Sequence, residues 1–237
     1  EVLYNAVPEL YAELEQLLST SYPDDSLSIP PFLRLGSWIG GDQDGNPAVS
    51  SQTLLEALHL QRTHVLEHYR SSIEALAQEY TQSLQYCSIT PTLRESLQRN
   101  AACMANYDRE LSSQTAQEPY RRKLSFIWKR LEATLSSSGE AAKREGKPED
   151  SNIAYKDAEE LLADLELVRE SLMADGEQDL ARGELAKLIR QVQVFGFHFA
   201  ALDVRQHSES HAAALTELLQ ATSLCQDYSS LDEAERV

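Results

Sequence analysis

The chain has 237 residues, of which 42% are hydrophobic and 25% are charged, and its formal net charge at pH 7 is −17. This is the composition of an ordinary globular protein, and the negative charge argues against nucleic acid or an anionic membrane surface as a partner. No run of about 18 apolar residues occurs, so the sequence predicts no membrane span. The 3 cysteines are far apart and favour buried thiols in a reducing, cytoplasmic compartment over disulfides or a zinc site.

Apolar periodicity predicts helices along most of the chain, and two short apolar runs are typical of β-strands. The helix predicted at 52–84 is the longest, with Ser50 or Ser51 as its cap. Its apolar residues are expected to face inward: Leu54, Leu55, Leu58, Val65, Leu66, Ile73 and Leu76. Further helices are predicted at 5–20, 91–112, 118–136, 155–174, 178–194 and 208–222, and strands at 33–40 and 197–204.

Residues 136–151 are polar and of low complexity, with serines at the start and a later run rich in lysine, glutamate and glycine. A segment of this composition has too few apolar side chains to support packed structure of its own. We therefore expect an exposed, mobile loop inside a single fragment that spans residues 1–237, and the loop does not by itself mark a domain boundary.

The segment LGSWIGGDQDGNP, residues 35–47, is the most informative, because glycines, acids, an asparagine and a proline crowd together after the first predicted strand. Glycine permits close approaches and positive φ angles that other residues resist, and we expect positive φ at Gly41 and Gly45. Asp and Asn side chains fold turns onto their own backbone. The residues expected to shape this loop are Gly40, Gly41, Asp42, Asp44, Gly45, Asn46 and Pro47.

Two metal sites can be considered from the sequence, and neither is predicted. The alternating acids from Asp42 suggest a calcium loop, but Gly45 stands at the fourth position and Pro47 at the sixth. Calcium loops of this kind need glycine at the sixth position and glutamate at the twelfth. His64 and His68 share one helical face in an H-x-x-E-H pattern. Catalytic zinc also needs a third ligand and a cleft, so these histidines are predicted to lie on an exposed helix face.

The glycine-rich segment closely resembles a signature of the phosphoenolpyruvate carboxylase family, Gly-Ser-Trp-Met-Gly-Gly-Asp-Arg-Asp-Gly-Asn-Pro. Two positions depart from it: Ile39 replaces Met, and Gln43 replaces Arg, so any contact made by that guanidinium is lost. Residues 202–208, LDVRQHS, are similar to the family's Leu-Asp-Ile-Arg-Gln-Glu-Ser segment, with His207 for Glu. The opening LYNAVP, residues 3–8, resembles a third family segment, and the three matches occur in family order.

The resemblance implies a mainly α-helical chain with a few β-strands that forms part of a helix-decorated β/α barrel of the TIM type. In such barrels the functional groups lie where strands end, and both signatures follow predicted strands. By this resemblance, Arg205 binds the phosphate region of phosphoenolpyruvate, and Trp38 lines the apolar pocket around its methylene carbon. From the residues alone, Arg205 can instead be a structural partner of an acid such as Asp203, and Trp38 a buried core residue.

The resemblance also implies a reaction. Members of the family join bicarbonate to phosphoenolpyruvate and yield oxaloacetate and phosphate, with Mg²⁺ or Mn²⁺ as the metal, and they assemble as homo-tetramers. The family's catalytic histidine segment, metal-binding acids and Gly/Arg-rich loop have no match in this chain. We therefore expect an internal fragment that is inactive alone, with no catalytic residue and no metal ligand of its own. The alternative is a non-catalytic helical scaffold or interaction module derived from that fold, which the Gln43 departure supports.

Overall fold

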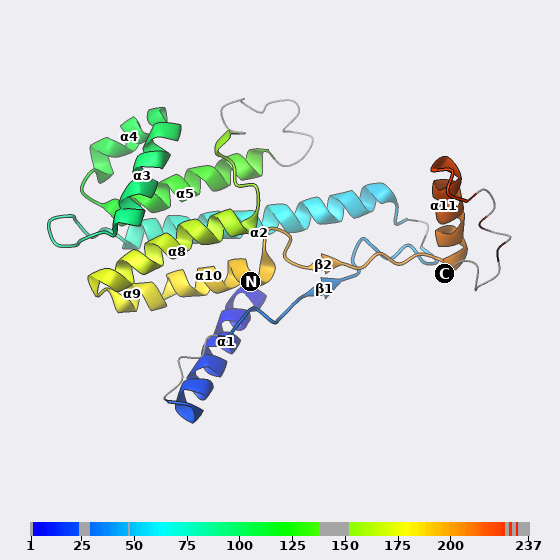
Figure 1. Ribbon diagram of the computed structural model, residues 1–237, viewed down its shortest axis with the longest axis horizontal. Helices are drawn as coiled ribbons and strands as arrows, with labels where there is room; N and C mark the ends of the chain where they lie inside the picture. Colours follow the sequence, from blue (N-terminus) through cyan, green and yellow to red (C-terminus); the bar gives the residue numbers. More distant parts are fainter. Residues whose placement is uncertain are drawn as a thin grey trace. The chain divides into compact units, whose positions relative to one another are not determined.

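The computed structural model describes residues 2–23, 29–46, 48–137, 152–225, 228 and 231. The chain is mainly helical with a few strand residues, as the sequence predicts (Figure 1). It forms two compact units, the helical unit (Glu1–Leu35 and His59–Phe199) and the strand unit (Gly36–Leu58 and Ala200–Val237). Pro47 and residues 138–151, which make up most of the predicted polar loop, lie outside the described residues.

The helical unit contains α1 (Val2–Ser21), α3 (Pro91–Cys103), α4 (Ala105–Thr115), α5 (Pro119–Ser136), α8 (Ala158–Asp175), α9 (Gln178–Arg182) and α10 (Glu184–Phe195). The long helix α2, Ser51–Glu79, begins in the strand unit and belongs to the helical unit from His59 onward. The strand unit also holds β1 (Gly36–Ser37), β2 (Ala201–Leu202) and α11 (Ser208–Ala221). Among the described residues, no helix combines the length and the apolar character needed to span a bilayer.

Local side chains explain where several helices begin and end. Pro91 opens α3, where its fixed φ suits the first helical position, and the Thr90 hydroxyl accepts a hydrogen bond from the first turn at 3.3 Å. Asp157 caps α8 by accepting from the N–H of Glu160 at 3.0 Å. The same helix is followed by Gly176 as its C-cap, with φ +90°, a conformation that glycine adopts without strain because it has no Cβ.

Two predicted helices are each divided in the structure. The helix predicted at 91–112 breaks at Met104 into α3 and α4, because Met104 is buried and has non-helical backbone angles. The helix predicted at 178–194 breaks at Gly183 into α9 and α10, because the backbone of Gly183 is not helical (φ −79°, ψ −131°). Met104 is not a typical helix breaker, so periodicity alone does not locate the first of these breaks.

Helix α2 is buried along its C-terminal part. The predicted inward residues that are buried are Val65, Leu66, Ile73 and Leu76. Leu55 and Leu58 are exposed and Leu54 is half-buried, so the prediction is wrong for the part of α2 in the strand unit, where the described residues leave this face uncovered. The helix ends at Glu79 and not at residue 84, because the N–H of Thr81 donates to the carbonyl of Glu79 at 3.0 Å and so makes no helical bond. The adjacent Tyr80 is buried, and its hydroxyl donates to the carbonyl of Leu180 at 2.8 Å.

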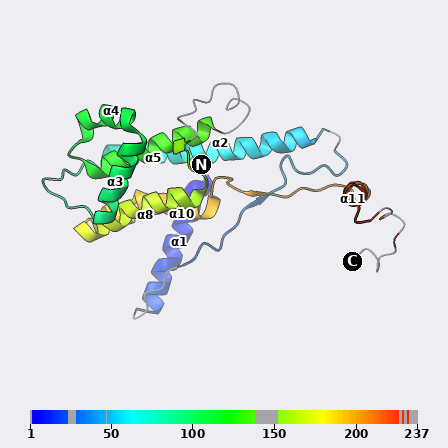
Figure 2. The ribbon, with the colours of Figure 1, turned by 45° about the horizontal axis from the view of Figure 1, so that its top comes forward.

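The core of the helical unit lies among α2, α5, α8 and α10, and α8 runs beside α10 in both ribbon views (Figures 1 and 2). Lys123 of α5 is fully buried, and its ammonium donates to Asp164 at 2.5 Å and to Ser96 at 2.8 Å. Arg130 at 2.9 Å and the Tyr155 hydroxyl at 2.8 Å donate to the other Asp164 oxygen. Burial lowers the pKa of Lys123. The buried charges of Lys123 and Asp164 are thus paired with each other, and Arg130 adds a second partner for Asp164. Such pairing offsets the free energy lost when a charge is removed from water.

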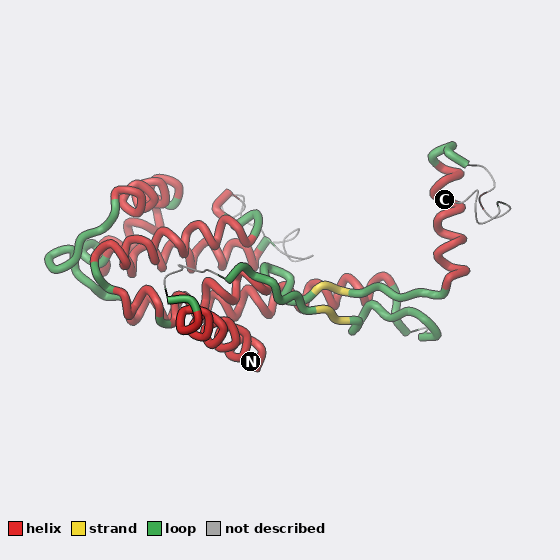
Figure 3. The backbone as a smooth tube through the Cα atoms, turned by 60° about the horizontal axis from the view of Figure 1, so that its bottom comes forward, coloured by secondary structure: helices red, strands yellow, loops and turns green. Residues whose placement is uncertain are grey.

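The strand unit is organised by a parallel pair of strands. β1 and β2 lie side by side (Figure 3), with Gly36 opposite Ala201 and Ser37 opposite Leu202. Parallel strands cannot be joined by a tight turn, and here the whole helical crossover lies between them in sequence. The pairing places the segments that follow the two strands at the same end of the pair.

Both strands are shorter than predicted. In the run 33–40, the N–H of Leu33 donates to the Tyr11 hydroxyl at 3.0 Å, so the start of this run belongs to the helical unit. In the run 197–204, Phe199 adopts φ +64° in a turn that follows α10. The apolar runs thus predict where both strands lie. The first residues of each run make other contacts and do not pair with the neighbouring strand.

The three cysteines are free thiols. Cys103 is exposed, whereas Cys87 and Cys225 are half-buried, so the prediction of buried thiols is wrong for Cys103. Burial raises the pKa of the Cys87 thiol, which keeps it in its less reactive protonated form.

Candidate functional site

The parallel register brings the two signature segments together at the carboxyl ends of β1 and β2 (Figure 3). Beyond the paired residues, the N–H of Asp203 donates to the carbonyl of Ser37 at 2.8 Å. The N–H of Arg205 donates to the carbonyl of Gly41 at 2.9 Å, and the carbonyl of Arg205 accepts from Gln43 at 2.7 Å. The glycine-rich segment therefore forms hydrogen bonds with both the N–H and the carbonyl of Arg205.

The glycines of this segment serve two different purposes. Gly40 has φ +84°, and a Cβ there would lie 2.6 Å from the Cβ of Ala57 on α2. A Cβ on Gly41 would lie 2.4 Å from the carbonyl oxygen of Asp203, whereas Gly45 has φ +71° and open space around it. Gly40 and Gly45 adopt a backbone conformation that favours glycine. Gly41 provides a close backbone approach, and the positive φ expected there is wrong.

Polar side chains fold the loop onto its own backbone. Oδ1 of Asp42 accepts from the N–H of Asp44 at 3.4 Å, and Oδ1 of Asn46 accepts from the N–H two residues onward at 3.1 Å. At the start of α2, Oγ of Ser50 accepts from the N–H of Thr53 at 3.3 Å, and Oγ1 of Thr53 accepts from the N–H of Ser50 at 3.2 Å. Ser50 is therefore the residue that caps α2.

Arg205 and Trp38 lie together beside Asp42. The guanidinium carbon is 5.8 Å from the centroid of the Trp38 ring, within cation–π range. Nη1 of Arg205 is 3.9 Å from Oδ2 of Asp42, longer than the roughly 2.7–2.9 Å of a charge-assisted hydrogen bond. The side chain of Arg205 is 54% exposed. Its acidic neighbour is thus Asp42 and not Asp203, the acid named as an example in the structural alternative, and Trp38 is 61% exposed within the described residues.

Sequence reasoning missed Gln206. Its Nε2 donates to Oε1 of Gln43 at 3.0 Å, and its Oε1 accepts from the N–H of His207 at 2.8 Å. His207 is the N-cap of α11, where Nδ1 accepts from the N–H of Glu209 at 3.4 Å. The signal that could have found Gln206 is its place directly after Arg205 in the second signature.

The two histidines of the H-x-x-E-H pattern have different surroundings. His68 stacks on Tyr4 with ring centroids 3.8 Å apart, and its Nε2 lies 3.0 Å from Oε1 of Gln191. Burial lowers the pKa of His68. His64 is 89% exposed and lies 3.8 Å from Glu67. The exposed face predicted for both is wrong for His68, and no three histidines, cysteines or acids gather as metal ligands in the part of the chain that the structure describes.

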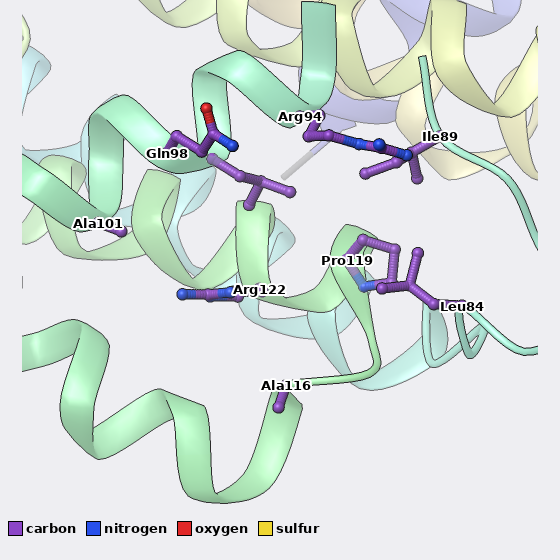
Figure 4. A pocket seen from close by; sticks show the side chains of 9 residues that line it. Leu84, Ile89, Arg94, Gln98, Ala101, Ala116, Pro119 and Arg122 are labelled. Atoms are coloured by element: carbon purple, nitrogen blue, oxygen red, sulfur yellow. The ribbon is translucent and has the colours of Figure 1, made fainter. Parts of the chain in front are cut away.

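A pocket of about 310 Å³ lies between α3 and α5 of the helical unit, next to Ala116 at the end of α4 (Figure 4). Its lining includes Leu84, Ile89, Arg94, Leu97, Pro119 and Arg122. Arg122 is ion-paired with Asp108 at 2.5 Å. Neither predicted substrate-binding residue lines this pocket, so it does not extend the candidate site.

The chain is similar to one family of enzymes along its whole length. The family model described as phosphoenolpyruvate carboxylase matches residues 1–237. The protein of that name from Roseiflexus castenholzii is 38% identical over 236 residues, which are 99% of this chain and 25% of the relative. Those from Thermosynechococcus vestitus and Ralstonia nicotianae are 38% and 39% identical, covering 100% and 97% of this chain but 24% and 23% of the relatives. The chain spans about a quarter of the length of the curated relatives that it matches. Because the family model covers every residue, the chain belongs to the phosphoenolpyruvate carboxylase family.

Proposed function

We propose that this chain supplies the substrate-binding arginine and tryptophan of a full-length phosphoenolpyruvate carboxylase, which joins bicarbonate to phosphoenolpyruvate and yields oxaloacetate and phosphate. The observation that carries the proposal is the position of Arg205, 5.8 Å from the Trp38 ring at the carboxyl ends of two parallel strands. Membership of the family supports the reaction, and the geometry supports the two roles.

In this proposal Arg205 binds the phosphate of phosphoenolpyruvate. A guanidinium stays charged at any working pH, and its planar fork offers two parallel hydrogen bonds to a phosphate. The backbone of Arg205 is hydrogen-bonded to Gly41 and Gln43. Because this backbone is already restrained, Arg205 loses less conformational entropy when it binds the substrate. Asp42, 3.9 Å away, balances the positive charge without a close contact to the fork.

Trp38 covers the methylene carbon of the substrate. After phosphoryl transfer, the enolate carbon must react with carbon dioxide and not with a proton from water. A large apolar ring beside the phosphate-binding guanidinium limits the access of water to that carbon. The exposure of Trp38, 61%, leaves ring surface available for this contact.

The whole protein is proposed to use Mg²⁺ or Mn²⁺, which when bound would neutralise charge on the transferring phosphoryl group. Such ions prefer carboxylate and phosphate oxygens. No group of three metal-binding side chains occurs among the described residues, and the proposal places no ligand of this ion on them. Its ligands, like the catalytic histidine, are assigned to parts of the full-length protein outside this chain.

We further propose that residues 1–237 are an internal piece whose strands β1 and β2 belong to a helix-decorated β/α barrel completed by the rest of the polypeptide. The parallel pairing and the polar groups at the strand ends support this assignment. Assembly into a homo-tetramer and a cytoplasmic location are also part of the proposal. The free thiols are consistent with a reducing compartment.

The test is a coupled oxaloacetate assay with Mg²⁺ and bicarbonate, applied to the full-length protein that contains this chain and to residues 1–237 alone. We expect turnover by the full-length protein and a blank rate from the fragment. Turnover by the fragment would contradict its assignment as an inactive piece. A folded, metal-loaded full-length protein without turnover would favour the helical scaffold, whose support from Gln43 is weakened by the hydrogen bond that this residue makes with Gln206.

A further inference from the structure

Gln206 connects two segments of the strand unit through its side-chain amide. Nε2 donates to Oε1 of Gln43 in the glycine-rich segment at 3.0 Å, and Oε1 accepts from the N–H of His207 at 2.8 Å. His207 in turn caps α11. Both glutamines are half-buried, so water competes less with these bonds than it would at an exposed site.

The two contacts fix the orientation of both amides. The N–H of His207 can only donate, so it must face the oxygen of the Gln206 amide. The opposite end of that amide is therefore its NH₂ group, which donates, and the Gln43 atom that it meets must be the oxygen. Two backbone bonds join the same segments: the N–H of Arg205 donates to the carbonyl of Gly41 at 2.9 Å, and the N–H of Gln43 donates to the carbonyl of Arg205 at 2.7 Å.

We propose that this side-chain pair, the Gln43–Gln206 clasp, positions Arg205 for the phosphate of phosphoenolpyruvate; the inference rests on the proposed carboxylase function. The clasp restrains Gln206, the next residue in the chain, and also Gln43, whose N–H is bonded to the Arg205 carbonyl. A restrained backbone keeps the guanidinium fork in the narrow range of positions that bidentate binding demands. Neither glutamine contacts the substrate in this account, and both act through Arg205.

Variants of the full-length protein test the clasp. Gln43→Met removes the acceptor at similar side-chain length, and Gln206→Met removes the donor together with the acceptor of the His207 N–H. The double variant Gln43→Arg with Gln206→Glu restores a donor–acceptor pair in the reverse direction. Gln52→Met is the matched control, because it removes an exposed hydrogen bond to Glu56 of 2.9 Å on α2 in the same unit.

We expect each single variant to lower kcat/KM for phosphoenolpyruvate by about three- to tenfold, mainly through KM, as for the loss of one hydrogen bond. KM for bicarbonate and the melting temperature should change little. The double variant should recover most of the loss, and Gln52→Met should behave as the wild type. Single variants that match Gln52→Met, or a double variant no better than the weaker single, would overturn the positioning role.

Failure of the clasp can be told apart from failure of the carboxylase function. If the wild-type full-length protein has no carboxylase activity, the proposed function fails, and the contact is then judged by amide hydrogen exchange. The N–H groups of Arg205 and Gln43 should exchange faster in both single variants than in Gln52→Met, because the clasp no longer restrains the segments that carry them. Unchanged exchange in the single variants would refute the clasp itself.

Discussion

A Cβ atom on Gly41 would lie 2.4 Å from the carbonyl oxygen of Asp203. The two signature segments thus pack backbone against backbone, with no room for a side chain between them. The same close approach allows the carbonyl of Gly41 to accept from the N–H of Arg205 at 2.9 Å. The glycine at this position therefore controls where the proposed substrate-binding arginine lies.

Gly41→Ala should lower activity strongly. The added methyl group must push the Asp203 carbonyl away, because a contact of 2.4 Å to a backbone atom cannot be accommodated without a shift. That shift should weaken the bond from Arg205 to Gly41. We expect kcat/KM for phosphoenolpyruvate in the full-length protein to fall by at least about tenfold, measured by steady-state kinetics.

Gly45→Ala is the comparison within the same loop. Gly45 has φ +71° but open space around it, so the new side chain meets no atom and the cost is conformational, about 1–2 kcal/mol. We expect this variant to lose less activity than Gly41→Ala. Equal losses would show that steric contact with Asp203 is not what makes Gly41 necessary.

The sequence predicted the helical class and the order of the elements because apolar periodicity survives in almost every packed helix. The lengths of the helices and strands could not be predicted as well, since they depend on tertiary contacts. Buried Tyr80, just past the end of α2, donates its hydroxyl to the carbonyl of Leu180, far along the chain, and buried Met104 divides one predicted helix in two without any breaker residue. The local pattern of apolar residues predicts neither of these contacts.

Lys123→Met should destabilise the protein. The buried ammonium donates to Asp164, Ser96 and Asn100, and its removal leaves two polar groups without a donor and weakens the pairing of a buried carboxylate. Arg130 still contacts Asp164, so we expect a loss of about 2–4 kcal/mol, near the lower end for a broken buried pair. Denaturant unfolding of the full-length protein, followed by far-UV circular dichroism, measures it.

Lys156→Met is the control for this substitution. Lys156 is 84% exposed and lies 4.0 Å from Glu160, and surface pairs of this kind contribute about 0–1 kcal/mol. A loss for Lys123→Met no larger than that for Lys156→Met would mean that the buried network does not stabilise the fold.

The stability of the protein should fall as the pH is lowered below about 6.5, in part because of His68. Burial lowers the pKa of His68 in the folded state, whereas the unfolded chain takes up its proton near the ordinary value of about 6.5. The unfolded state therefore binds more protons as the pH falls from that value toward the folded pKa, and stability decreases with it. His68→Gln should reduce the drop in melting temperature between pH 7.5 and pH 5.5.

His64→Gln provides the matched control, because His64 is 89% exposed on the same helix. Its melting temperature should follow the wild-type dependence on pH. If His68→Gln and His64→Gln have the same pH profile, the stacked imidazole beside Tyr4 is not the titrating group.

At the candidate site, the glycines stand out in the sequence by type and spacing, whereas Arg205 and Trp38 are predicted through the resemblance to the family. The two signatures that contain them follow predicted strands, and the structure places both signatures at the ends of β1 and β2. The pairing of Arg205 with Asp42 rather than Asp203, and the amide contact between Gln43 and Gln206, depend on the register of two strands far apart in the chain. No local pattern specifies that register.

Arg205→Lys separates substrate binding from a structural role. Lysine keeps the positive charge but loses the planar fork, so kcat/KM for phosphoenolpyruvate should fall by at least about tenfold, roughly 1.4 kcal/mol of transition-state binding. The affinity for bicarbonate should change less. The melting temperature should hardly move, because the side chain is 54% exposed and its carboxylate neighbour is 3.9 Å away. Steady-state kinetics and a thermal melt on the same full-length variant give both quantities.

Arg190→Lys shows what the same change does at a structural arginine. The guanidinium of Arg190 lies 4.3 Å from the Tyr11 ring centroid, donates to Glu15 at 2.7 Å and is largely buried. Lysine cannot reproduce the stacking and the fork together, so this variant should melt at a lower temperature while its kcat/KM stays near the wild-type value. The two variants should therefore show opposite effects on kinetics and melting. If Arg205→Lys instead behaves as Arg190→Lys does, Arg205 is a structural residue and the phosphate must be bound elsewhere.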